Sequence, residues 1–181
     1  HWITIPGGKF VMGCADGDGN CHEHEKPKRT VSLSEYKIQK YEVTNAEYVE
    51  YLNSNGNTCR RSINCVALPH SRLSKSDTSW TVDAGYENHP IIEVTWYGAD
   101  EYCKWIEARL PTESEWEKAA RGPSPREAIY PWGDASPTCS MANYRECIGA
   151  TSEVGSYPDG ASYYGVMDMA GNVWEWVNDV Y

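Results

Sequence analysis

The sequence predicts an α+β fold in which short antiparallel strands and two to three helices are joined by long loops. Apolar and polar residues alternate in stretches near both ends of the chain, helix start signals occur in its middle, and polar segments without periodicity lie between them. The 181 residues can bury a sizeable core, so a single domain over residues 1–181 is expected.

Most of the strands are expected near the N-terminus. Residues 1–13 are typical of two short strands around a Pro-Gly-Gly turn, and residues 30–43 alternate in the same way. The polar residues 14–29 between them are expected to form a solvated loop. One more short strand is predicted over residues 89–94.

Two helices are predicted from capping boxes, in which a Thr side chain and the Glu three residues later each bind the other's backbone N–H. They are expected over about residues 45–52 and 113–121. The two boxes are Thr44 with Glu47 and Thr112 with Glu115.

A third helix is expected over about residues 96–108, following the capping residue Thr95. Its core face includes Cys103, which is therefore interpreted as a small buried hydrophobe in preference to a catalytic thiol. Residues 53–89 lack periodicity and are expected to be a long loop. Together with residues 14–29, this loop is where recognition is expected, because loops on a rigid scaffold usually carry it.

Six of the seven cysteines fall into three close pairs, each in a polar stretch where a bridge would close a short loop. This pattern predicts disulfides and an oxidising, extracytoplasmic compartment. Metal ligation is the alternative, but the Cys-x-x-Cys spacing typical of zinc sites is missing. The expected pairs are Cys14 with Cys21, Cys59 with Cys65, and Cys139 with Cys147.

The formal net charge of −10 argues against nucleic acid and anionic membrane surfaces as partners, and it agrees with cation binding. No apolar run approaches the ~18 residues of a membrane span, so no transmembrane segment is expected. A protein, a peptide or a glycan remains as the class of ligand, and the sequence does not choose among them.

The C-terminal stretch, residues 167–181, combines a Gly-Asn turn with an alternating segment over residues 173–177. The alternation predicts a strand with Trp174 and Trp176 on one face, where two indoles supply enough apolar area to nucleate a core. Asp168 and Glu175 place carboxylate oxygens on either side of the turn.

Six motifs follow one another along nearly the whole chain: GGKFVMG at 7–13, YEVTN at 41–45, VTW at 94–96, RLPTESEWE at 109–117, YPWG at 130–133 and GVMDMAGNVWEW at 165–176. In this order they resemble the sulfatase-modifying-factor family, whose namesake is the formylglycine-generating enzyme. The resemblance implies a compact α+β fold with little regular structure, a variant of the C-type lectin-like fold.

The resemblance also implies a structural calcium ion at the C-terminal stretch. Its ligands would be the Asp168 and Glu175 carboxylates and the backbone carbonyls of Gly171 and Val173, which agrees with the preference of calcium for six to eight oxygen ligands. The alternative is that Asp168 caps the turn and Glu175 pairs with an arginine.

A second family ion would use the Asn143 side chain and the Tyr144 carbonyl. The remaining family ligands come from an acidic loop, which is replaced here by the shorter residues 145–149. A disulfide between Cys139 and Cys147 is the alternative means of holding this loop.

The family's oxidases hold copper with two cysteines in a segment beyond the Trp-Glu-Trp motif, and none of the seven cysteines matches those positions. Ergothioneine-pathway relatives use a histidine iron site, of which the five histidines show no sign. We therefore expect no catalytic residues, and a non-catalytic extracytoplasmic module that calcium stabilises, lacking the family's C-terminal segment. The alternative is a fragment of a copper-dependent oxidase that converts a sulfatase cysteine to formylglycine.

Overall fold

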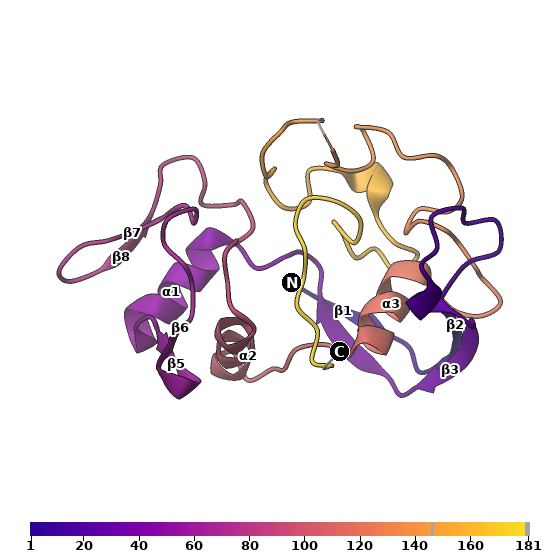
Figure 1. Cartoon of the computed structure of the whole chain (residues 1–181), viewed down its shortest axis with the longest axis horizontal. Coiled ribbons are helices and arrows are strands. Elements are labelled where there is room, and N and C mark those ends of the chain that lie inside the picture. The colour runs from indigo at the N-terminus through magenta and orange to yellow at the C-terminus, as the bar shows by residue number, and fades with distance from the viewer. Residues whose placement is uncertain (146, 180–181) are drawn as a thin grey trace.

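The computed structural model describes residues 1–145 and 147–179, which form short strands, three α-helices and long connections, as the predicted α+β fold requires. Two groups of elements flank the C-terminal stretch in Figure 1, with β1–β4 and α3 on one side and α1, α2 and β5–β8 on the other. The strands are β1 (Trp2–Ile5), β2 (Gly8–Met12), β3 (Arg29–Leu33), β4 (Tyr36–Gln39), β5 (Thr58–Cys59), β6 (Ile63–Asn64), β7 (Leu73–Lys75) and β8 (Trp80–Val82). The α-helices are α1 (Asn45–Asn55), α2 (Trp96–Trp105) and α3 (Glu113–Arg121).

The N-terminal strands form two antiparallel pairs, β1 with β4 and β2 with β3. Ile3 lies opposite Ile38 in the first pair, and Phe10 lies opposite Val31 in the second. The Pro-Gly-Gly turn thus connects two different sheets, and β1 and β2 do not form a hairpin with each other. Lys118 of α3 fixes this connection, because its buried Nζ donates to the carbonyl of Pro6 at 2.7 Å.

All three predicted helix caps are confirmed. The Thr44 and Thr112 hydroxyls each accept a hydrogen bond from the backbone N–H three residues later, and the Glu at that position completes each box. Thr95 caps α2 in the same way by accepting from Gly98 N at 3.1 Å. Helix α2 ends at Trp105, before the expected residue 108, because the chain turns into a left-handed conformation (φ 58°) at Glu107.

Two apolar clusters form the interior. The larger one gathers side chains from α1, α2, β5, β7 and β8 and from the residues after β6, and Tyr48 stacks on Tyr102 within it with ring centroids 5.5 Å apart. The smaller one packs Ile5 of β1 against Ala119 of α3 and Val166. Burying such side chains contributes roughly 25 cal/mol for each Å² of apolar surface removed from water, which favours this arrangement of the helices.

All three predicted disulfides are confirmed, and Cys103 is the free cysteine. Cys103 is half-buried and packs against the larger apolar cluster, and burial raises the pKa of its thiol to about 11. This agrees with its interpretation as a small hydrophobe. The bridges are Cys14–Cys21, Cys59–Cys65 and Cys139–Cys147.

The prediction of a long loop over residues 53–89 was wrong. This segment folds into two hairpins, β5–β6 and β7–β8, whose strands of two or three residues are too short to give a recognisable alternation. Trp80 of β8 is only 6% exposed, and its backbone N–H donates to the Asn53 side chain at 2.7 Å. Part of the segment is therefore core structure.

Two further expected strands are not formed by the described residues. Residues 89–94 make only isolated bridges, and residues 173–177 run without pairing to a strand. Trp174 and Trp176, expected to be buried, are 101% and 50% exposed. Alternation identifies an extended segment, but burial also requires a neighbouring strand to pair with it. The last residues of the C-terminal stretch, 180–181, lie outside the described residues.

No helix within residues 1–145 and 147–179 has both the length and the apolar character that crossing a membrane requires.

Candidate metal-binding turn and adjoining groove

The turn between Asp168 and Glu175 is built from residues in the left-handed region of backbone space. Asp168 has a φ of 57°, Gly171 of 91° and Asn172 of 56°. A Cβ atom on Gly171 would lie 2.5 Å from the carbonyl oxygen of Asn143, so only glycine fits there. This backbone folds the chain tightly and brings Asp168 and Glu175 into one region.

Asn172 joins the turn to the rest of the domain. Its Nδ2 donates to Glu42 Oε2 at 2.7 Å, and its Oδ1 accepts from Ser152 N at 2.9 Å. Its backbone N–H donates to the Asn143 carbonyl at 2.7 Å. The adjacent Val173 N–H donates to Glu42 Oε1 at 3.3 Å. Asn172 therefore positions Glu42 beside the turn.

Three carboxylates interact electrostatically at this turn: those of Glu42, Asp168 and Glu175. Glu42 and Asp168 are buried, and the Gly155 N–H donates to Asp168 Oδ2 at 2.6 Å. Among the described residues, none of the Lys, Arg or His side chains forms an ion pair with any of the three. The arginine partner considered for Glu175 is therefore not present among them, and the cluster lacks a compensating cation.

The same burial changes the acidity of the cluster. Burial raises the pKa of Glu42 to about 9, with further increases from the charges of Glu175 and Asp168. Burial also raises the pKa of Asp168. Glu175 stays accessible to water because it lines a groove, yet surrounding protein atoms remove enough solvation to raise its pKa to about 7. A bound divalent cation would favour the ionised form of all three groups.

Trp116 of α3 adds a polar group beside the cluster. Its indole N–H lies close enough to Glu175 to offset part of the rise in the pKa of that carboxyl. It does not reach hydrogen-bond geometry with any described residue. A carboxylate has acceptor capacity on both of its oxygens, so Glu175 can serve this donor and an ion together. The two buried acids, Glu42 and Asp168, therefore fit an oxygen-coordinated cation, whereas the Trp116 N–H can only donate to a carboxylate oxygen.

Asn143 and Tyr144, expected to hold a second ion, have different surroundings. Asn143 is buried beside the turn, and its Nδ2 donates to the Ala150 carbonyl at 2.7 Å. The Tyr144 carbonyl accepts from Cys147 N at 3.1 Å, within the loop closed by the Cys139–Cys147 bridge. Asn143 therefore supports the first site, while Tyr144 belongs to the disulfide loop. Glu146 of that loop lies outside the described residues.

A groove of about 920 Å³, called here the β4 groove, adjoins the carboxylate cluster. It is lined by β4 and the segment after it, by residues 91–94, by α2 and the segment after it, and by residues 172–176. Trp176 is held at its wall because its indole N–H donates to the Val94 carbonyl at 2.8 Å. The groove was not anticipated from the sequence, since it forms between segments that are distant along the chain.

Glu42 was missed as a site residue. Its motif, residues 41–45, was recognised, but its role depends on contacts with Asn172 and Val173, which are far away in sequence. The sequence did place this glutamate in a segment expected to be largely buried. A buried acid requires a partner or a cation, so Glu42 could have been proposed as a site residue on that ground.

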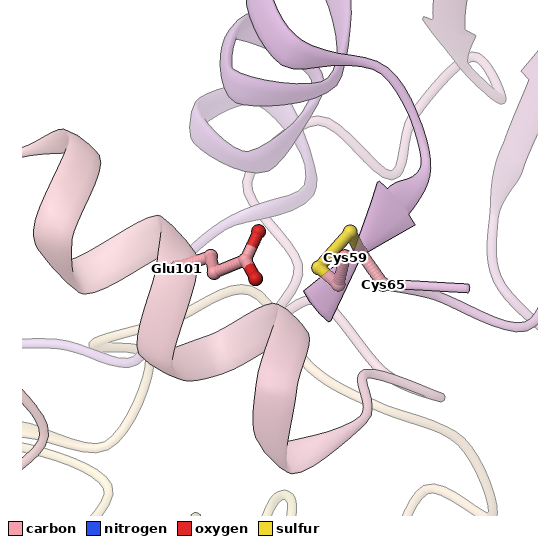
Figure 2. A group of neighbouring side chains, drawn as sticks. All are labelled: Cys59, Cys65 and Glu101. Atoms are coloured by element: carbon pink, nitrogen blue, oxygen red, sulfur yellow. A yellow bond between two sulfur atoms is a disulfide. The ribbon is translucent and has the colours of Figure 1, made fainter. Parts of the chain in front are cut away.

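Among the described residues, the potential metal-ligand atoms of Cys59, Cys65 and Glu101 all lie within 4.8 Å of one another, as Figure 2 shows, whereas the carboxylates of Glu42, Asp168 and Glu175 do not come that close together. The two sulfur atoms are bonded to each other, so they are not available as thiolate ligands. Glu101 instead accepts a hydrogen bond from Arg60 N at 2.7 Å. This group therefore stabilises the β5–β6 hairpin.

The fold and the turn define a disulfide-containing α+β domain with a carboxylate cluster beside a large groove. The whole chain, residues 1–181, matches the family described as the sulfatase-modifying factor enzyme 1-like domain, and the chain belongs to this family.

Proteins with several different names are similar to this chain over nearly its whole length. The serine/threonine-protein kinase Pkn1 of Chlamydia caviae is 37% identical over 99% of the chain, which spans 28% of that protein. The formylglycine-generating enzyme of Streptomyces coelicolor is 30% identical over 98% of the chain, which spans 68% of it. The structure of PvdO from Pseudomonas aeruginosa superimposes with a TM-score of 0.75 at 26% identity, covering 99% of this chain and 70% of that one.

Proposed function

We propose that this chain is a non-catalytic binding module of the sulfatase-modifying-factor family. The observation that carries this proposal is the state of its cysteines. Six are joined in disulfides, and the seventh, Cys103, is a half-buried thiol whose pKa is raised to about 11. Copper-dependent oxidation in this family requires two cysteine ligands, and residues 1–181 by themselves supply no pair of free thiols, so the proposal concerns this stretch of chain alone.

Calcium is proposed as the ion that stabilises the module. The Asp168 and Glu175 carboxylates and the Gly171 and Val173 carbonyls would hold it, and Glu42 would contribute negative charge beside them. Support comes from buried acids without a cationic partner among the described residues. When bound, calcium would compensate their repulsion and fix the turn. A second ion at Asn143 and Tyr144 stays a prediction.

An extracytoplasmic location is part of the proposal. The three disulfides support it, because such bonds persist in oxidising compartments. The match to Pkn1 supports the role of a module, because the region similar to this chain is 28% of that longer protein. The β4 groove supports a binding role, because large, mostly apolar concave surfaces are where proteins receive ligands.

Calcium binding is tested on the purified 181-residue chain by metal analysis and by thermal unfolding. We expect bound calcium, a lower Tm after treatment with EDTA, and recovery on adding calcium but not an equal concentration of magnesium, which prefers a smaller octahedral site. A Tm that neither EDTA nor calcium changes would overturn the calcium proposal.

The alternative function is copper-dependent oxidation of a sulfatase cysteine to formylglycine. The observation that favours it is the match to the Streptomyces coelicolor formylglycine-generating enzyme over 98% of the chain. The two functions are separated by incubating the chain with copper, oxygen, a thiol reductant and a cysteine-containing sulfatase peptide. The module proposal predicts no mass change of the peptide cysteine to formylglycine, and turnover would establish the oxidase instead.

A further inference from the structure

We propose that Cys59, Cys65 and Glu101 form a zinc site whenever the Cys59–Cys65 bridge is open, either before it is oxidised or after it is reduced. Two thiolates and one carboxylate would hold the ion between the β5–β6 hairpin and α2. The inference goes beyond the proposed binding function, and it uses neither the acids of the turn nor the surface of the β4 groove.

The three ligand atoms lie together where the hairpin meets α2 (Figure 2). The Cα atoms of Cys59 and Cys65 are 5.3 Å apart, and their Sγ atoms lie within 4.8 Å of a carboxylate oxygen of Glu101. Tetrahedral zinc with Zn–S bonds of about 2.3 Å holds two sulfur atoms about 3.8 Å apart. Once the bridge is open, rotation of the two cysteine side chains can reach this separation.

Glu101 has one carboxylate oxygen to offer. Its Oε1 accepts from Arg60 N at 2.7 Å, which holds the carboxylate against the hairpin. Its Oε2 lies 3.5 Å from the Tyr51 hydroxyl, which is 3.7 Å from both Sγ atoms. The hydroxyl therefore lies among all three ligand atoms. It can donate to one of them and orient it, as the groups around a metal site commonly do.

Zinc would also balance the charge of this buried place. Cys59 and Cys65 are 4% and 0% exposed, and a thiolate is costly there without a cation. Two thiolates, one carboxylate and Zn²⁺ together carry one negative charge, and Arg60 offsets it because its Nε lies 3.4 Å from Glu101 Oε1. The Glu101 side chain is 23% exposed, so water can reach the site and supply a fourth ligand.

The kinds of ligand select the metal. Calcium and magnesium prefer shells made of oxygen alone, and copper(I) prefers soft sulfur ligands without a carboxylate. Zinc accepts cysteine sulfur and glutamate oxygen in one tetrahedral shell. The combination of two cysteines with one glutamate therefore favours zinc.

Metal binding is linked to the redox state of the two cysteines. Zinc binding to the open form replaces two thiol protons. An oxidant that carries a disulfide can then close the bridge, because the two thiolates form the S–S bond and their two electrons reduce the oxidant to two thiols. This step takes up two protons from water and releases Zn²⁺. Zinc and the bridge are therefore alternatives, and the oxidised chain should not bind zinc at this place.

The test compares the open and closed forms of the 181-residue chain. The chain is unfolded, reduced and refolded in a phosphine reductant, and it is then titrated with Co²⁺, whose absorption reports tetrahedral geometry and thiolate ligands. We expect one cobalt ion with two thiolates beyond what Cys59→Ser combined with Cys65→Ser binds, because this variant keeps the other five cysteines. Zn²⁺ should displace the cobalt, and the oxidised chain should show no thiolate–cobalt absorption.

Glu101→Gln distinguishes a three-ligand zinc site from a simple pair of thiols. It removes the charged ligand but keeps an acceptor for Arg60 N, so the zinc affinity of the reduced chain should fall at least about tenfold. Glu50→Gln is the matched control, because it removes the same charge from an exposed position on α1. It should leave the zinc affinity unchanged.

Three results would overturn the inference: equal zinc affinity in Glu101→Gln and Glu50→Gln, a cobalt content that the double serine variant does not lower, or a reduced chain that stays unfolded with zinc. A reduced chain that folds only with one equivalent of zinc would support it. These outcomes are distinct from failure of the calcium proposal, which is measured on the oxidised chain by the response of the Tm to EDTA.

Discussion

Asn172 Nδ2 and Glu42 Oε2 form a 2.7 Å hydrogen bond between residues 130 positions apart in the chain. The bond places a buried acid from the segment after β4 beside the turn that contains Asp168. Removing a carboxylate from water costs free energy, and the hydrogen bond from Asn172 offsets part of that cost for Glu42. The contact therefore explains how a family motif near the N-terminus contributes to a site near the C-terminus.

Asp168→Asn separates the calcium-bound state from the calcium-free state. The substitution removes a charged ligand, so calcium affinity should fall at least about tenfold, which lowers the stabilisation at a fixed calcium concentration by about 1.4 kcal/mol. In EDTA the variant should be at least as stable as the original chain, because it removes a buried charge and asparagine tolerates the φ of 57°. Calorimetric titration and chemical unfolding measure both effects.

Asp159→Asn is the matched control, because Asp159 is exposed and lies outside the turn. It should leave calcium affinity unchanged. Equal loss of affinity in the two variants would mean that net charge, and not ligation at the turn, attracts calcium.

Glu115→Gln should change the dependence of stability on pH. The Arg109 guanidinium lowers the pKa of Glu115 below its ordinary value of 4.5, with help from the Thr112 N–H. A carboxyl whose folded pKa is lowered stabilises the fold above its unfolded pKa and loses that contribution as pH falls through the folded pKa. The variant should thus be about 1 kcal/mol less stable near pH 7, a figure kept small because Arg109 is largely exposed. The difference should vanish in strong acid.

Urea unfolding at several pH values measures this difference. Glu47→Gln serves as the comparison, because Glu47 completes the other capping box without an arginine partner. A difference for Glu115→Gln that stays constant from pH 7 into strong acid would show that the ion pair with Arg109 contributes nothing.

The helices could be predicted from the sequence because their signals are local. Thr44 and Glu47 lie within one turn of each other, and their capping box forms whatever the rest of the chain does. The hairpins β5–β6 and β7–β8 could not be predicted, because strands this short are defined by the partner and not by their own pattern. The exposure of Trp174 could not be predicted for the same reason, since burial of a strand face depends on what lies opposite it.

Tyr48→Phe should leave stability unchanged or raise it by up to about 1 kcal/mol. The Tyr48 hydroxyl is buried and has no hydrogen-bond partner among the described residues, so its removal relieves a desolvation cost while the ring keeps its contacts. Tyr51→Phe is the control and should destabilise the fold, because the Tyr51 hydroxyl lies 3.5 Å from Glu101 Oε2. Thermal unfolding distinguishes the two. A loss of more than about 1 kcal/mol in Tyr48→Phe would indicate that the hydroxyl has a partner such as an ordered water.

The candidate site could be predicted only in part. Asp168 and Glu175 were identified because they flank a Gly-Asn turn within one short motif. Glu42 and Trp116 join them through tertiary packing, which a single sequence does not reveal.

The Cys139–Cys147 and Cys59–Cys65 disulfides should be reduced in an order set by their burial. Thiol–disulfide exchange requires direct access of the attacking thiolate to a sulfur atom. Cys139 is exposed, whereas Cys59 and Cys65 are 4% and 0% exposed. Under native conditions, dithiothreitol should therefore open Cys139–Cys147 first and should reach Cys59–Cys65 only through unfolding, as timed alkylation and mass spectrometry would reveal. Replacing Cys59 and Cys65 together with alanine should cost about 2 kcal/mol or more, because the short loop and the core both lose a constraint. Reduction of the two bridges at equal rates would mean that the β5–β6 hairpin opens locally and that its packing against the larger apolar cluster is weak.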